Sequence, residues 1–333
     1  MVQVQAQAPT STLLLLSLTL SSTLSTAEPA RVLNRNFADP AIIQTPDGWY
    51  AFATTSGDIN VQVAHSSDFD SWGYLDDHDA LPGPFPAWVA SDPQPWAPDV
   101  FQRDDGQYVM YYSAIPRADS RRHCLGVAIS SAIEGPYTAV DGDGDGDEAW
   151  ACPLSQGGAI DASGFRDDDG TLYIAYKVDG SALNTDDENY HPTPLVLQEV
   201  ADNGYSKVGD AVTLIDRDES DGPLVEAPSI VKADGFYYLL YSSHMFNSPD
   251  YDSKYATAPS VAGPWTRRGR VVAPGDSSDV GPLSGPGGAD VSADGTKFVF
   301  HANINNQDPS GGRAMYATRV SLEGGNVTFV NES

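Results

Sequence analysis

A fivefold repeat constrains this chain more than any other feature. The dipeptide Asp-Gly recurs inside a similar phrase at Asp47, Asp105, Asp169, Asp234 and Asp294, with spacings of 58, 64, 65 and 60 residues. An alternating, aromatic-rich run follows each dipeptide: WYAFAT, QYVMYYS, TLYIAY, FYYLLYS and TKFVFH. Asp-Gly between two such runs is a strong hairpin signal. The repeat therefore predicts five related β-hairpins.

Further strands follow the hairpins. A third strand can be assigned in every unit and a fourth in most of them, such as AVTLI and RVVA. Five units of about four strands predict an all-β chain folded as a five-bladed β-propeller. A pair of β-sandwiches is the alternative, but it does not account for five evenly spaced units. We expect a single propeller domain over residues 31–333, with rim loops at 76–95, 141–158, 184–194 and 275–289.

The N-terminal segment has the composition of a secretion signal. An apolar run, LLLLSLTL, covers residues 13–20 and is followed by small residues near Ala27, although no Lys or Arg precedes it. We interpret residues 1–27 as a signal peptide, with a disordered tail as the alternative. The sequence thus predicts a secreted, extracellular protein.

The cysteines indicate the redox environment of the protein, and the acidic composition excludes some classes of binding partner. Cys124 and Cys152 are the only cysteines, and in an oxidising compartment they most simply form one disulfide. Sequons at Asn326 and Asn331 permit N-glycosylation in a eukaryotic host. Lys and Arg number 18 against 46 Asp and Glu, and the resulting charge of −28 repels nucleic-acid phosphates and anionic lipids. We expect a monomer that binds neither nucleic acid nor membranes.

Three carboxylic acids occupy similar positions in three of the five units. Counting eight residues back from each turn aspartate gives Asp39, Ala97, Asp161, Glu226 and Pro286. The first strand of a propeller blade lies innermost, so equivalent positions converge at one end of the central channel. Like charges in a partly buried pocket can keep one carboxyl protonated near neutral pH. This pattern favours a proton donor and a proton acceptor in one site, with strand capping as the alternative.

Four phrases carry a resemblance to a known family. NFADPAII, WAPDVFQRDDGQYVMYYSA, IDASGFRDDDGTLYIAY and VEAPSIVKADGFYYLLYSS resemble, in order, the motifs of glycoside hydrolase family 43, across essentially the whole mature chain. The resemblance implies a five-bladed propeller that hydrolyses arabinosides or xylosides with inversion. It also implies that Asp39 is the general base, Glu226 the general acid, and Asp161 a third carboxylate that tunes and orients the acid. Inversion places base and acid carboxyls roughly 6.5 to 9.5 Å apart.

The same resemblance suggests residues that contact the substrate. Trp96 of WAPD resembles an aromatic wall beside the bound sugar, with ordinary packing as the alternative. Phe37 precedes the presumed base and is a candidate for the same wall, although core packing is the favoured interpretation. Arg313 in GGRAMY resembles an arginine that donates to sugar hydroxyls or to the carboxylates, with a surface ion pair as the alternative.

We expect no cofactor and regard a channel metal as doubtful. Many arabinan-cutting members have a His in the fifth blade that helps to hold a metal, but here SGPGGAD places Gly288 at that point, and His301 cannot be assumed to replace it. The acidic run from Asp141 to Glu148 begins like a calcium loop but has Cys152 where the bidentate Glu belongs. We interpret that run as a solvated loop.

The expected activity is hydrolysis of α-L-arabinofuranosyl linkages, terminal or internal, in plant cell-wall arabinan or arabinoxylan. A β-xylosidase acting on xylo-oligosaccharides is the nearest alternative, because it uses the same acids. The chain leaves no room for the C-terminal β-sandwich of many β-xylosidases, which favours arabinan. A non-catalytic carbohydrate-binding propeller is the alternative from another class; such a protein tolerates loss of the acids, and all three are present here.

Overall fold

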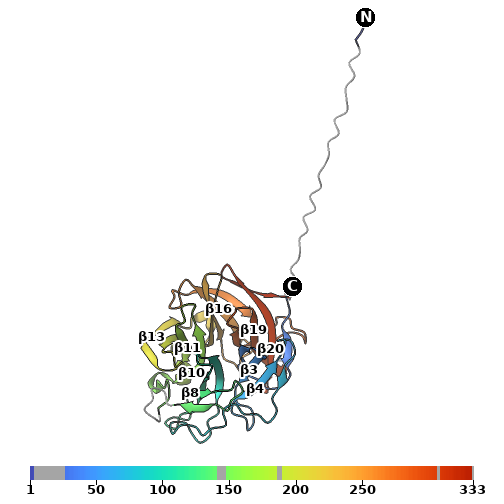
Figure 1. Ribbon diagram of the computed structural model, residues 1–333. Helices are drawn as coiled ribbons and strands as arrows, with labels where there is room; N and C mark the ends of the chain where they lie inside the picture. Colours follow the sequence, from blue (N-terminus) through green and yellow to red (C-terminus); the bar gives the residue numbers. More distant parts are fainter. Residues whose placement is uncertain (4–26, 141–147, 186–189, 306–307, 332–333) are drawn as a thin grey trace.

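The computed structural model describes residues 1–3, 27–140, 148–185, 190–305 and 308–331. Most of the segment interpreted as a signal peptide, and most of the acidic run, therefore lie outside the described residues. Five β-sheets contain all the named strands. Figure 1 shows the sheets following one another around a common centre, with the first sheet, in blue, beside the last, in red. The predicted five-bladed β-propeller is confirmed.

In blades 1 to 4 the strands run outward from the channel in chain order. Blade 1 contains β2 (Ala41–Thr45), β3 (Gly48–Ala53), β4 (Gln62–Ser66) and β5 (Gly73–Tyr74). Blade 2 contains β6 (Trp96–Gln102), β7 (Tyr108–Ala114), β8 (Cys124–Ser130) and β9 (Thr138–Val140). Blade 3 contains β10 (Ala159–Arg166), β11 (Leu172–Val178), β12 (Leu195–Val200) and β13 (Lys207–Ile215). Blade 4 contains β14 (Val225–Ala233), β15 (Phe236–Ser243), β16 (Asp252–Ala258) and β17 (Thr266–Val272).

Blade 5 closes the ring by joining the two ends of the chain. It contains β18 (Gly287–Val291), β19 (Lys297–Asn305), β20 (Asp308–Glu323) and, from the N-terminal side, β1 (Ala30–Leu33). Strand β1 pairs with β20 in antiparallel register, and β21 (Asn326–Val330) also pairs with β20. The outer strand of the last blade thus precedes the first repeat, a long-range pairing that local sequence patterns do not reveal.

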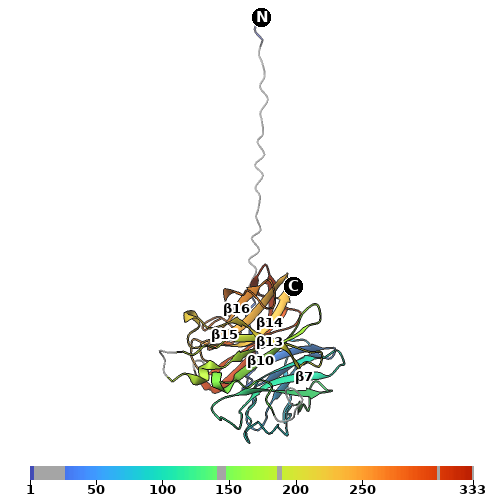
Figure 2. The same ribbon diagram turned by 90° about the vertical axis from the view of Figure 1, so that its left-hand side faces the viewer.

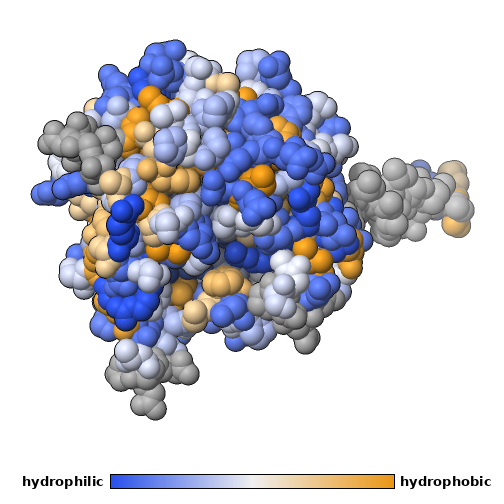
Figure 3. Space-filling view, turned by 90° about the horizontal axis from the view of Figure 1, so that it is seen from below, coloured by the Kyte–Doolittle hydropathy of each residue, from blue (hydrophilic) through white to orange (hydrophobic). Residues whose placement is uncertain are grey.

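Three short 3-10 turns are the only helical elements among the described residues: η1 (Leu154–Gln156), η2 (Gly180–Leu183) and η3 (Glu219–Asp221). No helical segment there has the length and apolar character needed to traverse a bilayer. Figure 2 shows the sheets from the side, with β7 and β10 in neighbouring blades. The face in Figure 3 is largely hydrophilic, with hydrophobic residues scattered over it, as the strong negative charge suggests.

The second strand of each blade is buried on both faces, because neighbouring blades pack against it. All seven residues of β7 are buried, and so are seven of the eight residues of β15. Between blades 1 and 2, for example, Phe52, Met110 and Tyr112 share one apolar cluster. Strands covered on both faces read as continuous hydrophobic runs, which explains the aromatic phrases of the repeat.

Each inner strand has one residue in the left-handed conformation at or near its start. These residues are Asp39 (φ 53°), Ala97 (φ 41°), Asp161 (φ 58°), Ala227 (φ 51°) and Gly288 (φ 55°). We call them the left-handed residues of the inner strands. Non-glycine residues adopt this conformation only where surrounding contacts enforce it. Its recurrence identifies the structurally equivalent position in all five blades.

The eight-residue count is therefore wrong for blades 4 and 5. In blade 4 the equivalent residue is Ala227, so Glu226 lies one position earlier, and in blade 5 it is Gly288 rather than Pro286. The reason is the variable connection between the first two strands of each blade. In blade 4 Asp234 is the first of the two turn residues between Ala233 and Phe236, whereas in blade 1 Asp47 is the second of the two between Thr45 and Gly48, and blade 3 has a longer loop between Arg166 and Leu172.

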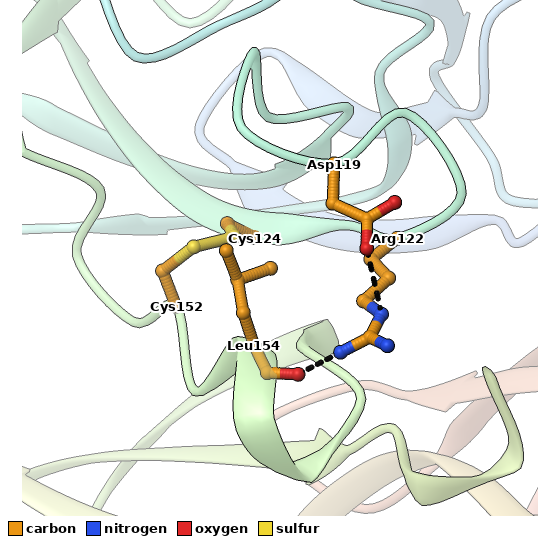
Figure 4. Close-up of a disulfide and its surroundings, with 5 residues drawn as sticks. All are labelled: Asp119, Arg122, Cys124, Cys152 and Leu154. Carbon is orange, nitrogen blue, oxygen red and sulfur yellow. Dashed lines mark hydrogen bonds and ion pairs between the residues drawn. A yellow bond between two sulfur atoms is a disulfide. The ribbon is translucent and has the colours of Figure 1, made fainter. Parts of the chain in front are cut away.

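A disulfide fixes the segment that leads into β10. Cys124, the first residue of β8, is bonded to Cys152, as predicted. Figure 4 shows that Arg122, which also forms an ion pair with Asp119, donates to the carbonyl oxygen of Leu154 just beyond the bridge. The segment that leads into β10 is thus held by both the disulfide and the hydrogen bond from Arg122.

Candidate active site

A cavity of about 590 Å³ lies at the end of the channel where the inner strands begin. Its lining includes Asp39, Asp161 and Glu226, which come from blades 1, 3 and 4, together with Trp96 and Arg313. This volume is typical of a site for a small ligand or part of a polymer. The structure therefore brings the three acids together although they are far apart in the sequence.

Asp39 is held by two side-chain donors, by contact with the His301 ring and by its own backbone amide. The Thr54 hydroxyl donates to Oδ2 at 2.6 Å, and Nη1 of Arg313 lies 3.2 Å from Oδ1. Nδ1 of His301 lies 3.3 Å from the same oxygen. Burial alone would raise the pKa of Asp39, but the Arg313 charge, the contact with His301 and the Thr54 hydrogen bond lower it well below its usual range. Asp39 is consequently an ionised carboxylate over the whole working pH range.

Asp161 has the opposite electrostatic character. Burial, followed by the charge of Glu226, raises the pKa of Asp161 well above its usual range. Its Oδ2 accepts a hydrogen bond of 3.0 Å from the Ala227 amide, one residue beyond Glu226. Asp161 therefore holds a proton beside Glu226 near neutral pH.

Both carboxylate oxygens of Glu226 have partners. Nζ of Lys177 lies 3.0 Å from Oε2, and the Tyr251 hydroxyl donates to Oε1 at 2.9 Å. Burial, together with the Glu226 charge, raises the pKa of Tyr251 well above its usual value, so its hydroxyl keeps its proton. The sequence reasoning missed both Lys177 and Tyr251.

A repeated feature of the second strands would have revealed Lys177. One polar residue stands on or directly after each second strand, two positions beyond the pairs Ala41–Phe52, Asp99–Tyr111, Ser163–Ala175, Ser229–Leu240 and Asp290–Val299. These residues are Thr54, Ser113, Lys177, Ser242 and His301. We call this place the second-strand polar position. In the sequence it ends or directly follows each aromatic phrase, where a polar residue interrupts an otherwise apolar run.

At four of the five blade junctions this position accepts a hydrogen bond from the next inner strand. Thr54 accepts from the Ala97 amide at 2.9 Å and Ser113 from the Asp161 amide at 3.2 Å. Ser242 accepts from the Gly288 amide at 2.9 Å, and Nδ1 of His301 lies 3.0 Å from the Asp39 amide nitrogen. These bonds satisfy the amides of the left-handed residues and so fix the acids in place.

The remaining predicted contact residues have different positions. Trp96 lines the cavity and stacks on the His123 ring, with centroids 3.9 Å apart. Arg313 also lines the cavity, and its guanidinium lies over the Phe246 ring at 4.9 Å. Phe37 does not line the cavity; it is fully buried in a core cluster and meets Tyr74 edge to face. Phe37 therefore packs in the core, as the favoured interpretation of the sequence has it.

The mouth of the cavity is partly apolar. Met245 and Phe246, in the loop between β15 and β16, line the cavity although they are 41% and 39% exposed. Tyr190 lines it as well, and Arg217 lies over its ring. Exposed apolar side chains at the edge of a polar site are typical of a surface that binds sugar rings.

The residues around Gly288 do not fit a metal held from that position. A side chain at 288 would meet the His301 ring at 2.6 Å and Oδ1 of Asp39 at 2.7 Å. The His301 ring itself is fully buried, and the Arg313 guanidinium lies 3.3 Å from its Nε2. Burial and the Arg313 charge lower the pKa of His301 to about 4, so its ring is neutral. Within the described ranges, no three His, Cys, Asp or Glu side chains are grouped to hold a metal ion.

This geometry combines an ionised carboxylate, Asp39, with two neighbouring carboxyls, Asp161 and Glu226, of which Asp161 holds a proton. A bond held between them can be attacked by an activated water molecule on one side and protonated on the other. Such a combination is suited to hydrolysis of an acetal, where the leaving oxygen needs a proton and the carbon needs a nucleophile.

Comparison with known proteins gives a consistent result. The family model for Glycosyl hydrolases family 43 matches residues 30–326. Extracellular endo-α-(1→5)-L-arabinanase 2 of Bacillus subtilis (strain 168) is 29% identical over 68% of this chain and 49% of its own length. An extracellular endo-α-(1→5)-L-arabinanase of Thermotoga petrophila is 32% identical over 41% of this chain and 33% of its own length. The chain thus matches about half of the first relative and a third of the second.

A solved structure resembles the whole propeller. The crystal structure of a thermostable family-43 glycoside hydrolase superposes with a TM-score of 0.72 at 26% identity. The match covers 90% of this chain and 94% of that chain.

Proposed function

Because this chain belongs to the glycosyl hydrolases of family 43, we propose that it is a secreted enzyme that hydrolyses α-L-arabinofuranosyl linkages with inversion. The observation that carries the proposal is the contrast inside one cavity between ionised Asp39 and Asp161, which holds a proton beside Glu226. The two relatives described above are named extracellular arabinanases, which supports both arabinan as the substrate and secretion.

In the proposed reaction Asp39 is the general base and Glu226 the general acid. Asp39 takes a proton from a water molecule as the water oxygen bonds to the anomeric carbon. The bond from that carbon to the leaving sugar breaks on the opposite face, its electron pair stays on the leaving oxygen, and Glu226 protonates that oxygen. Asp39 ends protonated and Glu226 ionised, and exchange with solvent restores both. Asp161, whose pKa is raised by burial and by the Glu226 charge, holds a proton beside the acid near neutral pH.

The proposed substrate contacts follow from the cavity lining. Trp96 offers a flat apolar face to the sugar, and Arg313 both donates hydrogen bonds and keeps Asp39 ionised. Met245 and Phe246 extend the apolar surface to the cavity mouth, where the next sugar unit of a chain would lie. A neutral plant polysaccharide is also compatible with a charge of −28, because it experiences no repulsion.

Two variants and three substrates test this proposal. Wild type, Asp39→Asn and Glu226→Gln are assayed on aryl α-L-arabinofuranoside, aryl β-xyloside and debranched arabinan. We expect the wild type to cleave the arabinofuranosyl substrates, and each variant to lose roughly 10²-fold or more in kcat on arabinan. Cleavage of aryl β-xyloside alone would make the enzyme a β-xylosidase. Activity equal to wild type in the Glu226→Gln variant would remove Glu226 from its role.

A further inference from the structure

One blade junction departs from the pattern that the other four share. At the second-strand polar position, Thr54, Ser113, Ser242 and His301 accept a hydrogen bond from the next left-handed residue. Lys177 has only donors and cannot do so. Asp161 accepts from the Ala227 amide instead. The exception is the junction between blades 3 and 4, which contains Glu226.

The ammonium group of Lys177 donates hydrogen bonds to two carboxylates and a hydroxyl in the cavity. Its side chain is 1% exposed, and Nζ lies 3.0 Å from Oε2 of Glu226 and 2.8 Å from Oδ1 of Asp179. The Ser181 hydroxyl lies 3.1 Å away. Burial alone would lower the pKa of Lys177, but the charges of Asp179 and Glu226 raise it above its usual value. Lys177 is therefore a permanent cation.

Building on the proposed function, we propose that Lys177 is a positioning residue for the proton donor, which confines the transferred proton to Oε1 of Glu226. An ammonium group has no lone pair, so a protonated Oε2 facing Nζ would place two donors against each other. The Tyr251 hydroxyl at Oε1 can accept as well as donate. Oε1 is accordingly the oxygen that delivers the proton to the leaving group.

The Lys177 charge also stabilises the product of that proton transfer. When Glu226 gives up its proton, the new carboxylate lies beside a cation that is already in place, which lowers the barrier without reorganisation. Asp39 across the cavity carries an opposing charge, whereas Asp161, on the same blade as Lys177, holds a proton because burial and the Glu226 charge raise its pKa. Asp179 balances Lys177, and His123 beside Asp179 is neutral because burial lowers its pKa to about 4.

The first test uses leaving groups of different quality. Lys177→Met removes the charge and keeps the length of the side chain. We expect kcat on arabinobiose, whose leaving group needs a proton, to fall about tenfold or more, and kcat on dinitrophenyl α-L-arabinofuranoside, whose leaving group does not, to change less than about threefold. Equal losses on both substrates in a folded variant would overturn the proposal.

The second test uses the pH profile and two oppositely directed variants. In Lys177→Met the alkaline limb of kcat/KM should move up by about one pH unit, because a nearby positive charge no longer favours the ionised pair. In Asp179→Asn, where Lys177 loses its balancing charge, the limb should move down. The Asp179→Asn variant keeps the test decisive if Lys177→Met does not fold. Unchanged limbs in both variants would contradict the inference.

Lys254→Met is the matched control. Lys254 is a similarly buried lysine in blade 4 that pairs with Asp221 at 2.8 Å and does not line the cavity. The Lys254→Met substitution should lower the melting temperature and leave both the leaving-group dependence and the alkaline limb of the pH profile unchanged. If Lys254→Met moved the alkaline limb as far as Lys177→Met does, the effect would come from destabilisation, and the proposal would be overturned. If the wild type were inactive on every arabinoside, the proposed function itself would be refuted. If activity were lost in Glu226→Gln but normal in Lys177→Met, only this inference would be refuted.

Discussion

Thr54 connects the proposed base to the neighbouring blade: its hydroxyl donates to Oδ2 of Asp39 at 2.6 Å and accepts from the Ala97 amide at 2.9 Å. One side chain thereby satisfies a left-handed residue in blade 2 and favours the ionised form of a carboxylate in blade 1. The Arg313 guanidinium, 3.2 Å from Oδ1, acts on the other oxygen. The base is thus held by blades 1 and 5 together.

Arg313→Met should move the acidic limb of the pH profile upward. Arg313 makes the largest of the contributions that lower the pKa of Asp39, and losing a partner that favours the ionised form raises that pKa. Activity on the acidic side should then be lost at a higher pH than in wild type, by about one pH unit or more. The measurement is kcat/KM on aryl α-L-arabinofuranoside from pH 3 to 9, a range in which wild type should keep Asp39 ionised and Arg313→Met should begin to lose activity at the acidic end.

Thr54→Val provides the graded comparison for Arg313→Met. It removes one neutral donor and keeps the shape of the side chain, so the shift should have the same sign and be smaller. An acidic limb that stays at its wild-type position in both variants would show that Asp39 is not the group that this limb reports.

Phe246→Ala should weaken binding of longer substrates selectively. Phe246 is 39% exposed at the cavity mouth, where the proposed second sugar lies. An aromatic contact contributes about 0.5 to 1.5 kcal/mol, so kcat/KM on arabinotetraose should fall roughly 2- to 10-fold, and that on arabinobiose less. Val280→Ala, at an exposed apolar residue outside this cavity, should change neither. Equal losses on both oligosaccharides would place Phe246 outside a chain-binding subsite.

The sequence predicts the blades well because each one is specified locally. The Asp-Gly turns and the aromatic second strands repeat in every unit, and one hairpin needs no information from another. Features that depend on blade junctions were missed. Strand β1 pairs with β20 across nearly the whole chain, and the left-handed residue of blade 4 is Ala227 because the Asp of its Asp-Gly dipeptide is the first turn residue rather than the second, as it is in blade 1.

The same distinction applies to the candidate site. Asp39, Asp161 and Glu226 stand in recognisable phrases, and the structure places them in one cavity. Lys177 and Tyr251 were missed because their importance appears only when neighbouring blades meet. Lys177 nevertheless leaves a visible signal, since it is a charged residue at the end of the apolar run LYIAY.

Asp99→Asn should stabilise the protein above neutral pH. Asp99 and Asp290 face the lower part of the channel, and burial, with the Asp290 charge, raises the pKa of Asp99 to about 7. Burial raises the pKa of Asp290 to about 6. The folded state therefore binds more protons than the unfolded state between about pH 4 and 7, so stability falls as pH rises through this window.

Melting temperatures at pH 5 and pH 8 test this prediction. The wild type should lose more stability between the two values than Asp99→Asn, whose neutral amide can still accept from the Gly164 amide. Parallel losses in both proteins would show that Asp99 does not titrate in this window.

Removing the disulfide should destabilise the fold without altering the chemistry. The Cys124–Cys152 bridge closes a loop with a sequence separation of 28, so replacing both cysteines with Ala should lower the free energy of unfolding by about 3 kcal/mol. Denaturant unfolding measures the loss, and kcat at 25 °C should be unchanged. Reducing agent should reproduce the loss in wild type and have no effect on the variant; a wild type insensitive to reduction would contradict the prediction.

The stereochemistry of the first-formed product tests the central claim most directly. If Asp39 activates water on the face opposite the leaving group, hydrolysis of aryl α-L-arabinofuranoside must first release the β-anomer of L-arabinofuranose. Proton NMR recorded in the first minutes, before mutarotation, distinguishes the two anomers. We expect the β-anomer signal to appear first. Initial release of the α-anomer would mean that a carboxylate attacks the sugar itself, and it would contradict the roles proposed for Asp39 and Glu226.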